Sequence, residues 1–238
     1  MGKQPPGAEN YQAPSNEWKW TVALFFATFL FGFNFIYVLF FSSTSEVLMA
    51  ASFALAAAAS FMYALAFASG SVSYYIGWPN MRDGYQKQIG VVAFWLSLAY
   101  SLTLLVLYPD VYYYGFFENF WSWDITLGLT AMLIFGAMTV INSKWVAPYF
   151  SWDIIKFVLG LGFVGYALLV IRAIFIEFDW WVYYLTTFEG DIPGRLVLSV
   201  VAFVVLVMRI SVPIHKSLTT PKSTPQPAPA RTGYISQK

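Results

Sequence analysis

Few side chains in this chain could do chemistry. The 238-residue sequence has no Cys, and its one His is His215, near the C-terminus. Counting therefore excludes disulfides, thiolate metal sites, iron–sulfur ligation and any mechanism that needs several imidazoles. A charged group inside a membrane span can mark function, although Lys and Arg near span ends also snorkel to the headgroups. The candidates within apolar runs are Lys156, Arg172 and Arg209 as cations, and Tyr63, Tyr100 and Tyr166 as mid-run hydroxyls.

The elements that carry these residues are long apolar runs. The chain is 59% hydrophobic and 11% charged, whereas a soluble domain has about 25% charged residues. The surplus apolar surface must face lipid, and a helix needs about 20 apolar residues to cross the bilayer core. The sequence therefore predicts an all-α, polytopic membrane helical bundle with six transmembrane helices. The predicted spans are Trp20–Phe41, Val47–Ile76, Ile89–Leu107, Ile125–Ile141, Ile154–Ile176 and Leu196–Ile210.

Composition also divides the chain into three parts. Residues 1–17 are polar and rich in Pro, Gln and Asn, and we expect a flexible N-terminus. Residues 18–216 hold all six spans and form the bundle. Residues 217–238 are rich in Pro, Thr and Ser without a large apolar cluster, which predicts a disordered tail.

The orientation follows from the distribution of Lys and Arg. Eleven of the thirteen basic residues fall at one end of the predicted spans, and the loops at the other end are acidic. The positive-inside rule therefore puts the N- and C-termini in the cytoplasm of a multi-pass protein of the cell (cytoplasmic) membrane. The net charge of +1 gives no reason to expect nucleic-acid binding. The lipid bilayer is the expected partner.

Small residues recur in two spans. Ala56, Ser60, Ala64 and Ala68 follow one another every four positions in the second span, and we call them the small-residue stripe. Such a stripe lets helix backbones approach closely in lipid, which predicts a helix at the centre of the bundle, or alternatively a dimer interface. Gly160, Gly162 and Gly165 in the fifth span could mark a transporter, and close packing explains them equally well.

Two outer loops are unusually aromatic. They contain Trp121 and Trp123 in one loop and Trp180 and Trp181 in the other. An interfacial aromatic belt on the bilayer is one interpretation. The alternative is a docking surface for a membrane or extracytoplasmic protein partner.

Three motifs resemble the ferric reductase-like transmembrane domain family, which includes the heme-binding membrane subunit of the periplasmic methionine sulfoxide reductase system. The part of the third span from Ile89 to Tyr100 follows a basic loop and contains the Gly and Ala-Phe of the family pattern. The fourth span from Ile125 to Thr139 is similar to the next helix of the family. Trp152-Asp153-Ile154-Ile155-Lys156 resembles its Trp-x-x-Leu-His motif. The resemblance covers roughly residues 47–176.

The resemblance implies a heme-binding fold, but its ligand positions carry other residues. Tyr100, Lys156 and Leu169 stand where the family has histidines. Bis-imidazole heme ligation needs a neutral nitrogen on each face of the iron, so we expect no cofactor, no metal and no catalytic residue. Heme b held by Lys156 or Tyr100 is the alternative.

Three functions remain open. The first is a degenerate, non-heme scaffold or accessory subunit, which is not an enzyme. The second is a divergent membrane oxidoreductase with unusual heme or quinone binding. The third is a small transporter or channel, for which broken helices or a polar stripe would be expected.

Overall fold

The computed structural model describes residues 15–41, 46–76, 79–189 and 194–219 of the chain. These residues form helices joined by turns, and six helices are long and apolar enough to cross a membrane. The predicted six-helix membrane bundle is confirmed. The spanning helices are α1 (Asn16–Phe41), α2 (Val47–Ile76), α3 (Pro79–Leu107), α5 (Trp123–Ile141), α6 (Trp152–Thr187) and α7 (Gly194–Thr219). Among the described residues, three short helices lie in the loops: η2 (Asp110–Tyr114), α4 (Phe116–Asn119) and η3 (Ala147–Tyr149).

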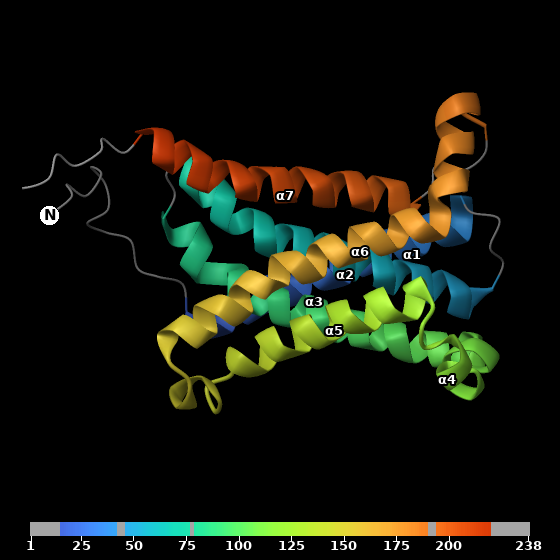
Figure 1. Cartoon of the computed structure of the whole chain (residues 1–238), viewed down its shortest axis with the longest axis horizontal. Helices are drawn as coiled ribbons and strands as arrows, with labels where there is room; N and C mark the ends of the chain where they lie inside the picture. The colour runs from blue at the N-terminus through green and yellow to red at the C-terminus, as the bar shows by residue number, and fades with distance from the viewer. Residues whose placement is uncertain (1–14, 42–45, 77–78, 190–193, 220–238) are drawn as a thin grey trace, which may run out of the picture.

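The helix ends differ from the predicted spans. α1 begins at Asn16, so its first turn includes two residues assigned to the flexible N-terminus. α6 continues well past Ile176 to Thr187, and its 36 residues correspond to about 54 Å, far more than the bilayer core of about 30 Å. Its last turns bend away from the bundle axis (Figure 1). α7 also continues past Ile210 and contains Pro213. Residues 217–219, the start of the predicted disordered tail, belong to α7, and the rest of the tail lies outside the described residues.

Five of the spanning helices form a closed ring. α2 packs against α3, α3 against α5, α5 against α6, α6 against α7, and α7 against α2. α1 lies outside this ring, where it contacts α2 and α3. Because the ring surrounds an interior of its own, side chains from all five helices can face the same space.

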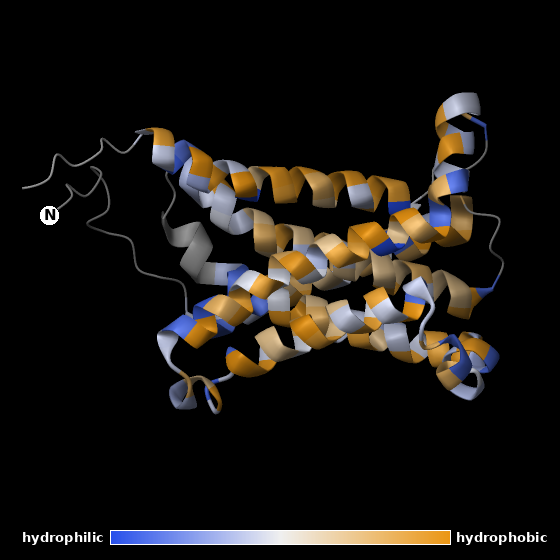
Figure 2. Ribbon diagram, in the orientation of Figure 1, coloured by the Kyte–Doolittle hydropathy of each residue, from blue (hydrophilic) through white to orange (hydrophobic). Residues whose placement is uncertain are grey.

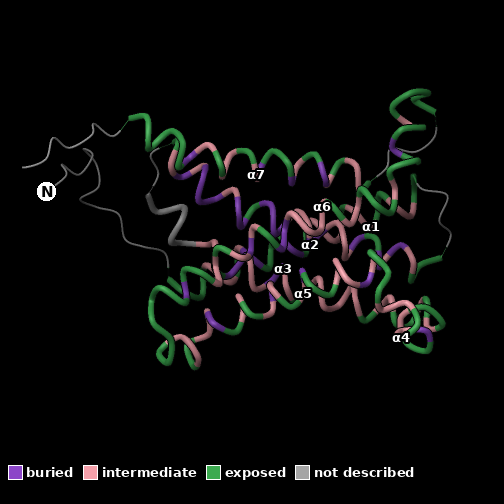
Figure 3. Tube along the Cα trace, viewed as in Figure 1, coloured by how far each residue is buried: buried purple, intermediate pink, exposed green. Residues whose placement is uncertain are grey.

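The buried residues concentrate on α2, as the purple segments in Figure 3 show. Most of them are Ala, Ser or Gly, whose small side chains let the neighbouring helices approach α2 closely. The predicted central position of this helix agrees with its contacts to α1, α3 and α7. The outer faces of the helices carry large exposed apolar residues along their length, as a lipid-facing surface requires (Figure 2).

The placement of the first and last described helix ends is the one that an even number of spans requires. α1 begins and α7 ends at the same end of the bundle, at the left of Figure 1. The connection between α5 and α6, which carries Lys144, lies at that end too, and we call it the inner end. The connection between α3 and α5, which carries Asp110, and the first turn of α7 lie at the opposite end, which we call the outer end.

The small-residue stripe gives a stability prediction. Ala64 is buried, so Ala64→Leu should overpack the interior and lower the free energy of unfolding by roughly 1–3 kcal/mol. Ala137→Leu, on an exposed position of α5, is the matched control and should be nearly neutral. Unfolding in mixed detergent micelles measures both variants. Equal stability of the two variants would show that α2 does not pack through this stripe.

Candidate functional site

The helices of the ring line a half-open cavity of about 410 Å³ in the outer half of the bundle. Its walls are mostly apolar and come from α2, α3, α5, α6 and α7, with Tyr112 of η2 and Phe116 of α4 at the outer end. Cavities of this size and character are typical of small-molecule sites. This cavity is therefore the candidate site.

Aromatic side chains form the inner boundary of the cavity. Tyr63 of α2, Phe135 of α5 and Tyr166 of α6 line it, and the Tyr63 and Phe135 rings stack with their centroids 4.1 Å apart. Phe67 and Phe163, whose centroids are 4.7 Å apart, pack beneath them. This aromatic floor separates the cavity from the inner half of the bundle.

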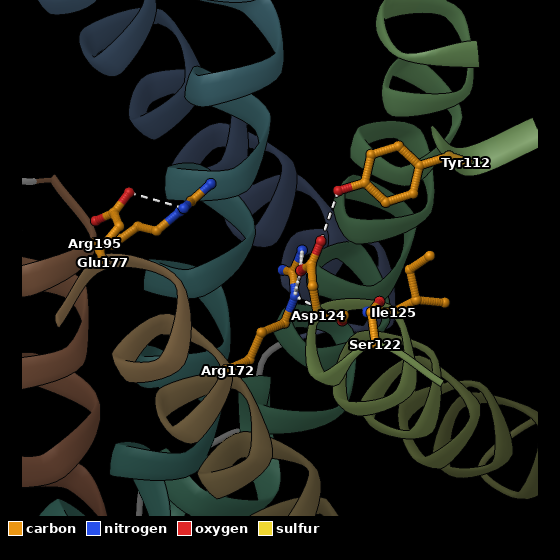
Figure 4. Close-up of polar contacts among 7 residues, drawn as sticks. All are labelled: Tyr112, Ser122, Asp124, Ile125, Arg172, Glu177 and Arg195. Carbon is orange, nitrogen blue, oxygen red and sulfur yellow. Dashed lines mark hydrogen bonds and ion pairs between the residues drawn. The ribbon is translucent and has the colours of Figure 1, made fainter. Parts of the chain in front are cut away.

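A charged pair lies at the outer end of the cavity. Arg172 of α6 reaches Asp124 of α5 through two nitrogens, with Nη2 2.5 Å and Nε 2.6 Å from Oδ1 (Figure 4). Nε also donates to the Asp124 carbonyl oxygen at 3.2 Å. The two side chains are only 17% and 29% exposed. Arg172 is therefore held inside the bundle by a carboxylate and does not snorkel freely to the headgroups.

Neighbouring residues of α5 hold Asp124 and Arg172 in position. The Ser122 hydroxyl caps α5 by accepting from the Ile125 N–H, so Asp124 falls in the first turn, where the helix dipole favours a negative charge. Gly128 lies one turn further along α5. A Cβ there would lie 3.2 Å from Nε of Arg172, so the glycine leaves room for the guanidinium.

Tyr112 completes this network from the loop side. Its hydroxyl donates to Oδ2 of Asp124 at 2.8 Å (Figure 4). Burial and the neighbouring Asp124 carboxylate raise the pKa of Tyr112 to about 12, because both disfavour a second negative charge at this place. Tyr112 therefore stays a neutral hydrogen-bond donor.

A second ion pair joins α6 and α7 beside the cavity. Nη1 of Arg195 lies 2.8 Å from Oε1 of Glu177 (Figure 4), and the other oxygen of Glu177 accepts from Nε1 of Trp181. Arg195 lines the cavity as Arg172 does. Because each of these guanidinium groups has a carboxylate partner, the paired charges cancel at the outer end.

The three ligand positions implied by the resemblance do not lie together. Tyr100 and Leu169 both line the cavity. Lys156 lies at the inner end, 59% exposed, with its Nζ 3.9 Å from Asp153 and above the Trp152 ring. The three mid-run tyrosines, by contrast, all line the cavity.

The small-residue stripe divides between two roles. Ala56 and Ser60 line the cavity, while Ala64 is buried in the core and Ala68 packs against it. In α6, Gly162 and Gly165 face side chains of α5 closely, including Met138 and Ile134, so helix packing accounts for both. Gly160 has open space where a Cβ would be.

The four tryptophans proposed as a partner surface have different environments. Trp121, Trp123 and Trp180 are exposed. Trp123 stacks on Phe175, and Trp180 stacks on Tyr183 in the last turns of α6. Trp181 is 8% exposed and donates to Glu177, so it cannot contribute to an open surface.

The sequence reasoning missed Asp124 and the cavity. Asp124 directly precedes the predicted fourth span, and Arg172 lies near the outer end of the fifth. Because consecutive spans run antiparallel, these two residues fall at the same depth in the membrane. Their opposite charges could therefore have predicted the ion pair. No comparable pattern in the sequence predicts the cavity between the helices.

The sequence matches no protein-family model and no curated protein. Among the residues that the structure describes, no group of three or more His, Asp and Glu side chains lies together as a metal ion would require. A proposal about function therefore depends on the residues that line the cavity.

The Arg172–Asp124 pair gives a prediction that a double-mutant cycle can test. Asp124→Asn and Arg172→Met should each lower the free energy of unfolding by about 3–5 kcal/mol, because each leaves one charge uncompensated inside the bundle. The double variant should lose much less than the sum. Lys156→Met breaks an exposed pair and should be nearly neutral. Additive losses at Asp124 and Arg172 would contradict the coupling.

Tyr112 gives a pH prediction. A tyrosine in the unfolded chain titrates near pH 10, and the folded pKa is about 12. The stability contributed by the neutral hydroxyl is therefore complete below pH 10 and is lost as the pH rises towards 12. Wild type should lose more stability over this interval than Tyr112→Phe, whereas Tyr113→Phe, at an exposed neighbour, should follow wild type. Parallel curves for wild type and Tyr112→Phe would contradict the prediction.

Proposed function

We propose that this chain is a non-heme, non-catalytic accessory subunit of the cell (cytoplasmic) membrane, built on a degenerate ferric reductase-like bundle. The observation that carries the proposal is the arrangement of the three ligand positions. The two that line the cavity are Tyr100 and Leu169, and the third, Lys156, lies at the inner end. No pair of nitrogen ligands can therefore flank an iron in the cavity.

The chain's one imidazole does not change this conclusion. His215 lies near the inner end of α7, where its Nδ1 is 2.8 Å from the Tyr74 hydroxyl. The cavity occupies the outer half of the bundle, beyond the aromatic floor. Bis-imidazole ligation would need two such groups on opposite faces of one heme.

The cations within the spans also favour a structural role. Arg172 and Arg195 are bound by carboxylates. Such neutral pairs fix neighbouring helices relative to one another, and neither of these two guanidinium groups is free of its carboxylate. An accessory bundle needs this rigidity and no redox centre.

An accessory role also requires a surface for the subunit that it supports. The exposed Trp121 lies on an outer loop, Trp123 begins α5, and Trp180 lies in the last turns of α6. Aromatic residues are enriched at protein interfaces and equally at the membrane surface. The proposal therefore places the partner on the outer side of the membrane, where these exposed tryptophans lie.

The transporter alternative gains less support. Discontinuous helices at mid-membrane are the usual sign of a transport site. Each of the spanning helices is continuous over its described residues. Gly162 and Gly165 serve close packing of α6 on α5.

An absorption spectrum tests this proposal. Protein purified from cells given ample heme precursor should show no Soret band, because the cavity offers no pair of axial ligands. A stoichiometric Soret band that shifts on dithionite reduction would overturn the proposal. Loss of that band in Tyr100→Phe or Lys156→Ala would then identify the ligand and establish the divergent oxidoreductase.

A further inference from the structure

The two short helices between α3 and α5 form one hydrogen-bonded unit. Pro109 has no N–H to continue the hydrogen-bond ladder of α3, and η2 and α4 follow it. The Gly115 N–H donates to the Asp110 carbonyl at 2.8 Å, and the Asn119 N–H donates to the Gly115 carbonyl at 2.9 Å. These bonds lie within the unit. η2 and α4 can therefore move together without losing them.

This η2–α4 unit has one face on the cavity and one face away from the protein. Tyr112 of η2 and Phe116 of α4 line the cavity at its outer end. On the other face, Tyr113, Tyr114 and Phe117 are exposed. α4 packs mainly on η2, and η2 reaches the bundle at α3. Segments with so few contacts to the rest of a fold open at a low free energy.

Two side-chain hydrogen bonds join this part of the chain to α5. The Thr126 hydroxyl donates to the Phe120 carbonyl at 2.8 Å, close to the point where the chain enters α5. The Tyr112 hydroxyl donates to Oδ2 of Asp124 at 2.8 Å. Among the described residues, this second bond is the one that reaches from within the η2–α4 unit to a spanning helix. Because Asp124 is itself held by Arg172, the bond ties the unit to a fixed ion pair.

From this geometry we propose that η2 and α4 form a lid over the outer end of the cavity, and that the hydrogen bond from Tyr112 to Asp124 is its latch. The lid turns about its junctions with α3 and α5, near Pro109 and Ser122. When the latch breaks, Tyr112 and Phe116 leave the cavity wall, and the cavity opens to water at the outer surface of the membrane. The inference needs only the cavity and this connection, so it stands independently of the accessory role.

Thiol labelling measures the opening of the lid. The chain has no Cys, so an introduced one is its only thiol. Ser101 of α3 lines the cavity, and Ser101→Cys is the reporter variant. The purified full-length chain in lipid nanodiscs is treated with a quaternary-ammonium methanethiosulfonate, and mass spectrometry follows the labelling rate. Because this cation does not enter the bilayer core, it reaches the cavity through water.

Tyr112→Phe removes the latch and keeps the ring. In the Ser101→Cys background it should raise the labelling rate by about 10- to 100-fold, the effect of one hydrogen bond to a carboxylate on an equilibrium. Tyr113→Phe, at the exposed neighbour on η2, is the matched control and should leave the rate unchanged. An unchanged rate in Tyr112→Phe would overturn the proposal.

Two further measurements distinguish opening of the lid from a general loosening of the bundle. Ser71→Cys places the thiol at a buried position near the inner end of α2, and its labelling should stay slow with or without Tyr112→Phe. Spin labels at Phe117→Cys on α4 and Val197→Cys on α7, both exposed positions, report the distance across the outer end. Tyr112→Phe should broaden this distance distribution towards longer values. Faster labelling of Ser71→Cys, or an unchanged distance distribution, would each contradict the lid.

Discussion

Helices in lipid gain little from burying apolar surface against one another, because lipid tails are as apolar as the side chains that they would replace. Association then depends on how closely backbones can approach. In this bundle α2 meets that constraint with buried Ala, Ser and Gly residues, and it contacts α1, α3 and α7. Gly162 and Gly165 serve the same purpose between α5 and α6. Small residues therefore allow close packing at the contacts of α2 and between α5 and α6.

The same constraint leaves space where small residues meet no partner. Ala56 and Ser60 belong to the same stripe as Ala64, but they line the cavity. Below them, Tyr63 and Phe67 fill the interior. The Tyr63 ring stacks on Phe135 of α5, and the Phe67 ring packs against Tyr166 of α6. The change from small to aromatic residues along one helix therefore sets the depth of the cavity. The ion pair of Arg172 with Asp124 then fixes α6 to α5 at its outer end.

Much of the fold followed from the sequence because lipid imposes simple rules. Run length and hydropathy gave six spans, and four-residue spacing identified α2 as central. α6 extends beyond the predicted fifth span because its aromatic residues end a hydropathy run without ending a helix, and α7 continues through Pro213 beyond the predicted end at Ile210. The site was harder to predict. Tyr63, Tyr100 and Tyr166 were singled out as mid-span hydroxyls, but their convergence on one cavity depends on helix rotation, which side-chain packing decides.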